Sequence, residues 1–379
     1  MDSHCGRENI RMKVLHLSSE RTWRGGEQQI AYLIEELEKY GVENYVACRK
    51  NSAFEAYCQD KGIPYFSFSF HFQYDLLAGI EIKKICKEFG INIVHLHSSF
   101  SHGIGYVSAL TGNKTPMILS RRVDFPVKKN LITQLKYNHN SIKKILCVSK
   151  SIENMVRPAI KNPERCQTIY SGIDLSRFEN IQSTGFLRNT YSLAKDTLLV
   201  GNISAIAPHK DYFTFVDTAE ILINNNPTIY FFIIGDGPSK QDIIKYILKK
   251  GLEKKIFLTG FRKDAPELLA ELDIFLITSA TEGLGTTILD AFATGTPVVA
   301  TRGGGITETV LHEQTGLLAE VGDSRELAAN INRLIQDNTL QLSLISNARQ
   351  KVLDFSKEKT AQKTLEAYNT VIKRKSRLD

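Results

Sequence analysis

Residues 274–301 read IFLITSATEGLGTTILDAFATGTPVVAT, and this stretch decides the fold class. It opens with an apolar run, continues through a loop with two glycines, and predicts a helix over 286–294 that ends at Gly295. Pro297 then introduces a second apolar run, VVAT. Apolar runs without alternation are typical of parallel strands that are covered on both faces. The stretch therefore predicts a strand–helix–strand unit of an α/β protein.

The same alternation of apolar runs and helix-like segments continues along the chain. Strands are expected at 13–18, 44–48, 93–98, 117–120, 144–149 and 167–170, and again at 198–204, 230–235, 255–259, 274–278 and 297–301. Residues 179–197 are polar and contain no strand-like run. This pattern predicts two doubly wound α/β domains, over 12–190 and 191–355, that divide near 180–196.

Length, charge and cysteine usage exclude several classes of protein. The 379 residues suit two domains, and 48 Lys+Arg against 41 Asp+Glu give a net charge of +7. That charge is too weak to indicate nucleic acid, but it fits an anionic substrate or membrane surface. No run approaches the ~20 apolar residues of a spanning helix, and the polar residues 1–11, without the apolar stretch of a signal peptide, are expected to precede the fold. The six cysteines form no CxxC pair, which favours reduced thiols of a cytosolic protein over metal ligands.

Four loops follow predicted strands, at the edge where open α/β sheets bind ligands. They are Arg24–Glu27 (RGGE), the loop 201–210 that ends in Lys210, the loop 279–287, and the loop 302–308 with three successive glycines. Glycines allow a ligand to approach the backbone closely, and a helix N-terminus attracts an anion. Taken alone, the loop Arg24–Glu27 is equally compatible with a plain tight turn, the loop 302–308 with a flexible glycine-rich loop, and a single lysine is usually a solvated charge.

Together these motifs resemble the family 4 retaining glycosyltransferases, whose fold is called GT-B. The resemblance covers about residues 12–370 and is strongest over 197–322. Further matches are YSGID at 170–174, IGDGP at 234–238, HEQTGLL at 312–318 and, in the first half, VHLH at 94–97. The resemblance implies an α/β protein of two Rossmann-like domains that face an interdomain cleft. The last helix, 356–379, is expected to cross back to the first domain.

The resemblance also implies a role for each matching residue. Glu282, His97 and Lys210 are the expected catalytic residues, with Glu282 and His97 near the donor sugar and Lys210 on the donor phosphate. The expected donor site comprises Gly25, Gly26, Lys210, Glu282, Gly283, Gly285, Thr286, Thr287, Asp290, Gly304 and Gly305. Asp290, where the family usually has Glu, is expected at the ribose hydroxyls. The family's second phosphate residue, an arginine, is replaced by Ala205, so this phosphate interaction is either missing or supplied by Arg24, Arg121, Arg122 or His209.

The resemblance implies an enzyme that transfers a sugar from a nucleotide-diphosphate sugar. The donor expected first is a UDP-sugar, and GDP- and ADP-sugars are the next candidates. The acceptor is expected to be a glycan, a lipid-linked molecule or a small molecule of cell-surface polysaccharide, lipopolysaccharide or glycolipid synthesis. No cofactor or metal is expected, since no DxD motif ends a strand of the first domain. Two alternatives stay open: a nucleotide-sugar 2-epimerase on the same fold, and a non-catalytic nucleotide-sugar-binding subunit.

The acceptor is expected on the first domain, where His102, Arg121, Arg122 and Asp124 are the candidates. The pair Arg121-Arg122 either binds an anionic acceptor or pairs within the protein. Residues 125–146 mix basic and apolar side chains. They are equally compatible with a surface that rests on an anionic bilayer and with an ordinary amphipathic helix. The expected location is the cytoplasm, with peripheral attachment to the inner face of the membrane as a further hypothesis.

Overall fold

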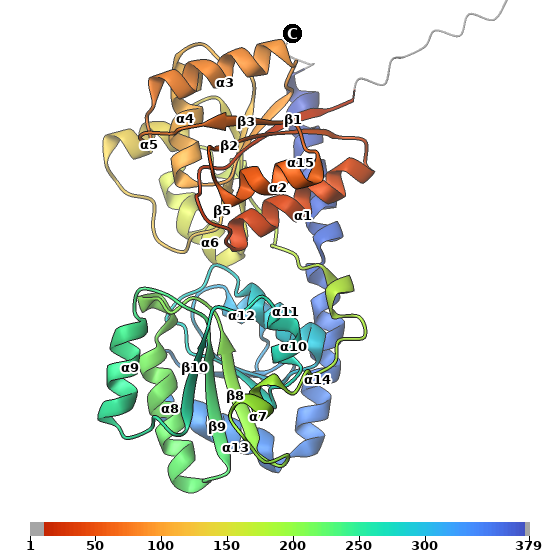
Figure 1. Cartoon of the computed structure of the whole chain (residues 1–379). Helices are drawn as coiled ribbons and strands as arrows, with labels where there is room; N and C mark the ends of the chain where they lie inside the picture. The colour runs from red at the N-terminus through yellow and green to blue at the C-terminus, as the bar shows by residue number, and fades with distance from the viewer. Residues whose placement is uncertain (1–10, 376–379) are drawn as a thin grey trace, which may run out of the picture. The chain divides into compact units, whose positions relative to one another are not determined.

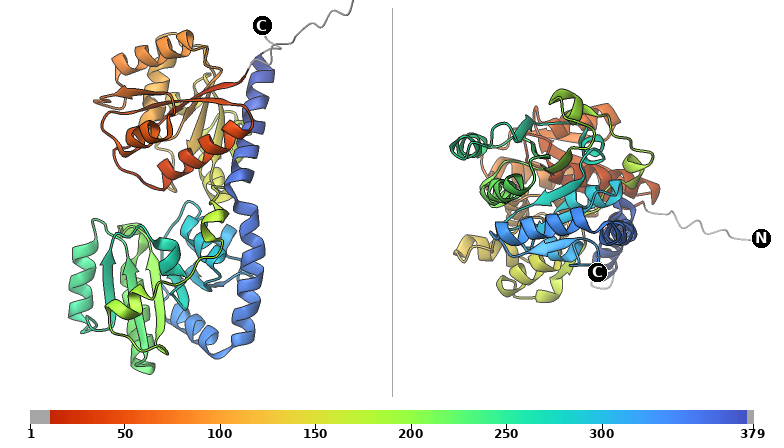
Figure 2. Two further views of the ribbon diagram at one scale, coloured as in Figure 1. Left: turned by 45° about the vertical axis from the view of Figure 1, so that its right-hand side comes forward. Right: turned by 90° about the horizontal axis from the view of Figure 1, so that it is seen from below.

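The computed structural model describes residues 11–375, and the chain divides into two compact units. The first unit consists of the chain up to Val148, of Glu153–Ile169 and of the segment from Lys357 onward. The second unit consists of Ser149–Ile152 and Tyr170–Ser356. In each unit, helices cover both faces of a central sheet (Figures 1 and 2). Residues 1–10 and the last four residues of the predicted helix 356–379 lie outside the described part of the chain.

The first unit is built on a seven-stranded parallel sheet of order β3-β2-β1-β4-β5-β6-β7. Its strands are β1 (Lys13–Leu17), β2 (Glu43–Arg49), β3 (Tyr65–Phe68), β4 (Ile93–Leu96), β5 (Met117–Arg121), β6 (Ile142–Cys147) and β7 (Cys166–Thr168). Its helices are α1 (Gly25–Lys39), α2 (Ala53–Lys61), α3 (Leu76–Glu88), α4 (Ser99–Leu110), α5 (Leu131–Asn138), most of α6 (Lys150–Val156), and α15 (Lys357–Lys375).

Alternate residues of β1 and β4 face different helices. Val14 and Ile93 share a buried cluster with Leu37 of α1 and Tyr368 of α15, so these two helices cover one face. On the other face, α4 lies so close to β4 that a Cβ at Gly105 would meet the Leu96 side chain at 2.8 Å. The last helix of the chain therefore supplies part of the core of the first unit.

The second unit is built on a six-stranded parallel sheet of order β10-β9-β8-β11-β12-β13. Its strands are β8 (Leu198–Ile203), β9 (Ile229–Ile234), β10 (Ile256–Gly260), β11 (Ile274–Ile277), β12 (Val298–Thr301) and β13 (Leu317–Ala319). Its helices are α7 (Phe186–Thr190), α8 (Tyr212–Asn225), α9 (Lys240–Lys249), α10 (Ala265–Leu269), α11 (Thr286–Thr294), α12 (Ile306–Thr309), α13 (Ser324–Gln336) and α14 (Asn338–Val352). The strand order reverses between β8 and β11, which is the switch point where open sheets of this kind bind ligands.

The α/β class and the arrangement of two doubly wound parallel sheets are confirmed. Helix α11 spans 286–294 as predicted, whereas the edge strands β3 and β13 had not been expected. The units divide at Tyr170 and not within 180–196. The reason is that Ile173, Phe178 and Leu187 pack into the core of the second unit, beside Leu199.

Within the described residues, no helix is both long enough and apolar enough to cross a bilayer.

Candidate functional site

Three loops of the second unit meet at the carboxyl ends of β8, β11 and β12, which are neighbours in the sheet. The Ala280 amide donates to the His209 carbonyl oxygen at 2.8 Å, which joins the β11 loop to the β8 loop. The Thr301 hydroxyl donates to the Ser279 carbonyl oxygen at 2.6 Å, which joins the β12 loop to the β11 loop. The three loops therefore form one connected surface at the switch point, as the motifs predicted.

A buried ion pair lies on this surface, between Lys210 and Glu282. The side chains are 14% and 11% exposed, and Glu282 Oε1 also accepts from the Ser279 hydroxyl at 2.7 Å. Lys210 ends a short 3-10 turn, and the next residue, Asp211, is left-handed (φ 46°) and caps α8. The backbone thus fixes the base of the lysine, while the ion pair holds its ammonium beside a carboxylate that can accept hydroxyl groups.

The glycines of the β12 loop are required by the fold. A Cβ at Gly305 would lie 2.2 Å from the Gly283 carbonyl oxygen, and one at Gly304, where φ is +59°, 2.6 Å from the Glu282 carbonyl oxygen. The Gly305 amide donates to that same Glu282 oxygen at 2.8 Å. The sequence assigned this amide to the donor sugar, but the structure engages it within the protein.

Helix α11 begins on the same surface. Its N-cap residue, Gly285, is left-handed (φ 76°), and no side chain caps the helix. The amides of the first turn, which include those of Thr286 and Thr287, carry the positive end of the helix dipole and suit an anion. The helix N-terminus that the sequence assigned to a phosphate therefore exists, on a helix of nine residues.

Asp290 lies further along α11, half-buried. Desolvation raises the pKa of its carboxyl to about 7, and the positive charge of Arg177 partly opposes this shift. Arg177 belongs to the 3-10 turn Leu175–Phe178, which packs on α11. Near neutral pH, the Asp290 carboxyl is therefore protonated in some molecules, where it can donate a hydrogen bond, and ionised in the others, where it only accepts.

We expect Asp290→Asn to stabilise the free protein in a pH-dependent way. The pKa of Asp290 is higher in the folded than in the unfolded protein. The contribution of this carboxyl to the free energy of unfolding is therefore fully favourable below pH 4 and is lost as the pH rises to about 7. The increase in the free energy of unfolding caused by Asp290→Asn should grow from near zero at pH 4 to roughly 1–3 kcal/mol at pH 8. Urea unfolding at both pH values measures it, with Asp242→Asn, an exposed change on α9, as control. An equal effect at both pH values would contradict the assignment.

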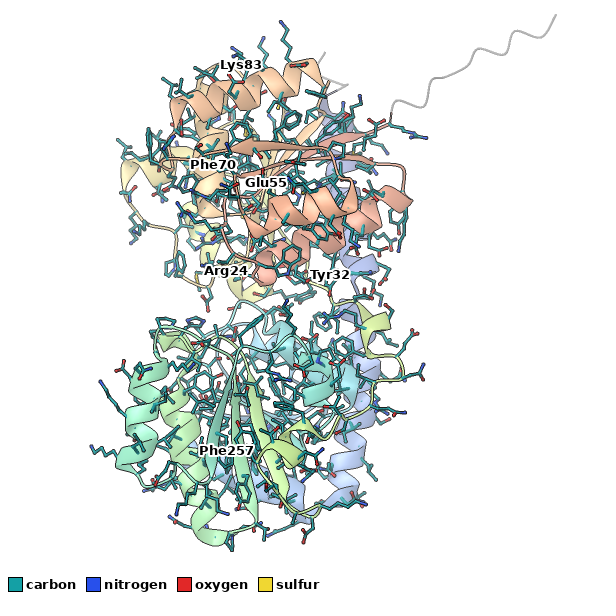
Figure 3. All side chains as sticks on the ribbon, viewed as in Figure 1. Arg24, Tyr32, Glu55, Phe70, Lys83 and Phe257 are labelled. Carbon is teal, nitrogen blue, oxygen red and sulfur yellow. The ribbon has the colours of Figure 1, made fainter. Side chains whose placement is uncertain are left out.

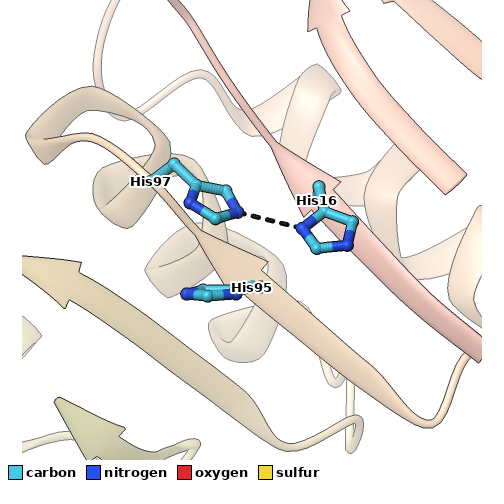
Figure 4. Close-up of side chains that lie close together, drawn as sticks. All are labelled: His16, His95 and His97. Atoms are coloured by element: carbon cyan, nitrogen blue, oxygen red, sulfur yellow. Dashed lines mark hydrogen bonds between the residues drawn. The ribbon is translucent and has the colours of Figure 1, made fainter. Parts of the chain in front are cut away.

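Three buried histidines lie together in the first unit (Figure 4). His16 on β1 and His95 on β4 are register partners, and His97 follows two residues after His95, so all three lie on the face that α15 covers. His16 Nδ1 lies 3.0 Å from His97 Nε2, and His16 Nε2 lies 3.0 Å from Asn44 Oδ1. His95 contacts the hydroxyls of Tyr368 at 2.6 Å and Ser120 at 2.8 Å.

The hydrogen bonds fix the tautomers of two of these rings. The Asn44 amide nitrogen donates to the Val42 carbonyl oxygen, so Asn44 Oδ1 must accept a hydrogen bond from His16 Nε2–H. Burial lowers the pKa of His16 to about 4 and also holds the pKa of His97 well below its usual value, so both rings are neutral. His16 Nδ1 is then an acceptor, and His97 Nε2 must be its donor. This relay leaves His97 Nδ1 as a buried lone pair, which has no hydrogen-bond partner in the structure.

Three neutral imidazoles also have the composition of a metal site, since their ligand atoms lie within 4.8 Å of one another. Both nitrogens of His16 and of His95 already have partners, however. The nearby Arg122 guanidinium lowers the pKa of His95 and His97 further, and it would repel a cation. The geometry fits a hydrogen-bonded relay better than a metal centre.

His97 opens onto a cavity of about 470 Å³, called here the first cavity. It is lined by Glu20, Arg24, Gly26, Glu27, Gln73, His97, Ser98, Ser99, Phe100, Leu119, Ser120, Arg121, Arg122, Val123, Phe125 and Tyr137. Glu27 Oε2 and the Nε atoms of Arg121 and Arg122 are buried without a partner, like His97 Nδ1. Burial raises the pKa of Glu27 and lowers that of Arg122 to about 10. The unpaired acceptors and donors suit a ligand that carries both hydroxyl groups and an anion.

A second cavity of about 350 Å³ shares part of its wall with the first. The lining residues common to both are Gln73, Ser99, Arg121, Phe125 and Tyr137. The remaining lining residues of the second cavity are Tyr74, Pro126, Val127, Lys128, Asn130, Ile132, Thr133 and Lys136. The part of the second cavity that lies away from the first is therefore of mixed character, with apolar side chains beside two lysines, Asn130 and Thr133.

The other predicted residues are distributed between the units. His102 is buried on α4, with Nε2 3.2 Å from the Lys136 carbonyl oxygen, and neither His102 nor Asp124 lines either cavity. Arg24 is exposed at the start of α1, where it contacts Thr22 and Glu20 (Figure 3). Of the four side chains that could bind phosphate in place of the arginine absent at Ala205, only His209 belongs to the second unit with Lys210.

Several residues of these sites were not found from the sequence. Glu27 stood out only as part of a glycine motif. Lys136 belongs to the run 125–146, for which a bilayer surface and an ordinary amphipathic helix were equally open, and it is buried. His16 stands in the run KVLHLS, where a polar residue within a buried strand was the available signal. Asn44 carried no signal, because its pairing with His16 depends on how β1 and β2 pack.

Gly26 allows a direct test of ligand approach to the first cavity. A Cβ at Gly26 would meet nothing within 4 Å, so the fold itself does not require glycine there. We expect Gly26→Ala to leave the free energy of unfolding within about 0.5 kcal/mol of the parent. The same change should weaken ligand binding in this cavity at least tenfold if a ligand approaches the amide closely. Gly305→Ala is the contrasting variant and should destabilise the protein, while unchanged binding in Gly26→Ala would remove Gly26 from the site.

Two doubly wound units, with glycine loops and a Lys–Glu pair at the switch point of the second, form the architecture of the GT-B fold. Residues 23–177 match the family described as Glycosyltransferase Family 4, and residues 184–351 match Glycosyl transferases group 1. An uncharacterised glycosyltransferase of Methanocaldococcus jannaschii is 31% identical over 295 residues, 76% of this chain and 77% of that protein. The chain belongs to glycosyltransferase family 4.

A second relative and a solved structure are also similar to this chain. The UDP-Gal:α-D-GlcNAc-diphosphoundecaprenol α-1,3-galactosyltransferase of Escherichia coli is 27% identical over 307 residues, 78% of this chain and 79% of that protein. The crystal structure of Anabaena HepE in complex with UDP-glucose superposes with a TM-score of 0.82 at 23% identity. It covers 95% of this chain and 100% of HepE, and this likeness shows the fold.

Proposed function

We propose that this glycosyltransferase moves a sugar from a nucleotide-diphosphate sugar to a glycan, lipid-linked or small-molecule acceptor, with retention of the anomeric configuration. The acceptor would belong to cell-surface polysaccharide, lipopolysaccharide or glycolipid synthesis. The observation that carries the proposal is the buried Lys210–Glu282 pair between glycine loops at the switch point. Ligands of open α/β sheets bind at this place, and the pair offers a cation for a phosphate beside an acceptor for hydroxyls.

In the proposed reaction, the bond between the anomeric carbon and the diphosphate oxygen breaks, and negative charge develops on the leaving diphosphate. Lys210 and the amides of Thr286 and Thr287 stabilise that charge without a metal ion, because they are fixed before the reaction begins. The acceptor hydroxyl attacks the same face of the sugar and gives its proton to the leaving phosphate oxygen. Glu282 holds sugar hydroxyls, and Asp290 holds those of the ribose.

The first unit contributes to the same reaction through His97. Its free Nδ1 lone pair suits a hydroxyl group that donates a hydrogen bond. Gly26 offers its amide to the diphosphate, which the open space around its Cα permits. The acceptor occupies the cavity lined by Arg121 and Arg122.

UDP-sugars are the first donors to test. The name of the E. coli relative states UDP-Gal, and HepE was crystallised with UDP-glucose, which supports a uridine nucleotide here. UDP-, GDP- and ADP-sugars should be screened for thermal stabilisation, followed by assays of donor hydrolysis, transfer and product anomer. Stabilisation by one nucleotide with transfer is the expected result, and no stabilisation by any donor would overturn the proposal. Binding without turnover would support the non-catalytic alternative, and a 2-epimerised nucleotide sugar would support the epimerase.

We also propose peripheral attachment to an anionic membrane through α5 and the loop before it. Phe125, Leu131, Ile132 and Leu135 are each at least half exposed, and Lys128 and Lys129 lie beside them on the surface. Apolar side chains bordered by lysines suit the headgroup region of an anionic leaflet. This surface would present the adjoining second cavity to a lipid-linked acceptor.

Vesicle sedimentation tests the attachment. Binding to vesicles with anionic lipid should fall as salt rises and should drop at least tenfold when Leu131 and Leu135 are both changed to serine. Equal binding to neutral vesicles would count against the contribution of the lysines.

A further inference from the structure

Arg121 and Lys136 are two buried cations that have no carboxylate beside them. They are 5% and 3% exposed, and within the described residues neither forms an ion pair. Arg121 Nη2 donates to the Phe125 carbonyl oxygen, while its Nε has no partner. The Lys136 ammonium lies 3.3 Å from the Ser99 carbonyl oxygen. Both side chains therefore keep donors that the protein leaves unused.

Such an arrangement is unfavourable in the absence of an anion. Burial and, to a smaller extent, the neighbouring Arg121 guanidinium together lower the pKa of Lys136 to about 8. Burying one charge without a partner is costly, and placing a second like charge near it adds repulsion. By contrast, two other largely buried lysines are paired, Lys210 with Glu282 and Lys357 with Glu36. The missing partner of Arg121 and Lys136 is thus a negative group that comes from outside the protein.

The position of the two cations shows where this group would lie. Arg121 lines both cavities, Lys136 lines the second, and Ser99, which accepts from Lys136, lines both. On one side of this boundary the first cavity offers His97, Glu27 and Arg122 to a polar group. On the other side the second cavity combines apolar side chains, such as Val127 and Ile132, with the basic side chain of Lys128.

We infer that Arg121 and Lys136 bind a phosphate or diphosphate group of the acceptor, at the boundary between the two cavities. This inference rests on the proposed function and adds the chemical class of the acceptor. The planar fork of arginine and the compact charge of lysine together suit the several oxygens of a phosphate. The part of the acceptor that carries the hydroxyl groups then lies in the first cavity. The group on the other side of the phosphate lies in the second cavity. The phosphate belongs either to a lipid carrier or to a soluble sugar phosphate.

Inorganic diphosphate is the probe for the anion site. Calorimetric titrations should use the full chain with Lys210→Ala, so that Lys210 cannot take up the anion, at constant ionic strength and pH 7. We expect saturable binding that is at least tenfold weaker with Lys136→Met or Lys136→Gln and within about threefold with Lys136→Arg. Lys129→Met, an exposed change beside α5, should bind like the parent. The affinity should fall above about pH 8, where Lys136 loses its proton.

Two further measurements keep the inference separate from the proposed function. Lys136→Met removes an unpaired buried charge, so we expect the folded protein to be at least as stable as the parent. In Lys136→Met with the native Lys210, the nucleotide sugar should stabilise the protein against heat as much as it stabilises the parent. A loss of diphosphate binding in Lys136→Met would then not be due to a damaged donor site. If farnesyl phosphate binds at least tenfold more tightly than glucose 1-phosphate, the phosphate belongs to a lipid carrier. If the two bind equally, it belongs to a soluble sugar phosphate. Diphosphate binding that is absent, or equal in Lys136→Met and the parent, would overturn the inference.

Discussion

Replacement of Lys210 by alanine is expected to lower kcat/KM for sugar transfer by about 10²- to 10³-fold. The ammonium is the cation that the β8 loop holds next to the N-terminus of α11, where the leaving diphosphate is proposed to lie. A preorganised charge lowers the barrier most where charge develops in the transition state. Steady-state kinetics with the donor found in the nucleotide screen measure the effect. Transfer at the parent rate would remove Lys210 from the proposed mechanism.

Stability measurements separate this catalytic effect from a structural one. Lys210→Ala leaves the buried Glu282 carboxylate with the Ser279 hydroxyl but without its cation, so we expect roughly 1–3 kcal/mol less stability. The double variant Lys210→Met with Glu282→Gln should recover most of that stability while remaining inactive. Lys240→Ala is the matched control, because Lys240 forms an exposed ion pair with Asp236 in the same unit. It should change neither activity nor stability measurably.

His16→Leu is expected to lower kcat by about 10- to 100-fold, with less than threefold change in the KM for the donor. His16 does not line the first cavity, and its effect would pass through His97, whose Nε2–H it accepts. Without that acceptor, the proton of His97 is free to move to Nδ1, where it would remove the lone pair proposed to receive a substrate hydroxyl.

The tautomer of His97 provides a readout that a purely structural role of His16 would not change. In protein with ¹⁵N-labelled histidine, the parent should show protonated Nε2 on His97, and His16→Leu should show a mixture of tautomers. His16→Gln can accept from His97 and donate to Asn44, so it should restore most of the activity. Full activity in His16→Leu, with the tautomer unchanged, would contradict the relay.

The loops at the carboxyl ends of β8, β11 and β12 could be located from the sequence because their features are local. Helix α11 lies between Gly285 and Gly295, both left-handed, so its limits were visible as residue types. Two of the four edge strands, β3 and β13, were missed; they have four and three residues, too few for a distinct strand pattern. The domain boundary was misplaced because polar stretches around 179–197 still bury Leu187 against the second core.

Residues whose roles depend on distant partners could not be predicted in the same way. The environment of Lys136 depends on α4, which packs beside α5 and places the Ser99 carbonyl oxygen at its ammonium. The run 125–146 gave this lysine the same pattern as the exposed Lys128 and Lys129. Gly305 was assigned to a ligand because the sequence shows that glycine is needed and not what approaches it, which here is the Gly283 carbonyl oxygen.

The place of α15 in the first unit has a consequence for the order in which the protein is made. The second unit is nearly continuous in the chain, over Tyr170–Ser356, so most of it leaves the ribosome before α15 is complete. The first unit begins synthesis earlier, but Tyr368, which packs beneath the sheet and contacts His95, is added only after the whole of the second unit. The core of the first unit can therefore be completed only after the second unit has been synthesised, whereas domains usually fold from the N-terminus onward during synthesis. A fragment that ends at Ile169 would lack the helix that closes its own core.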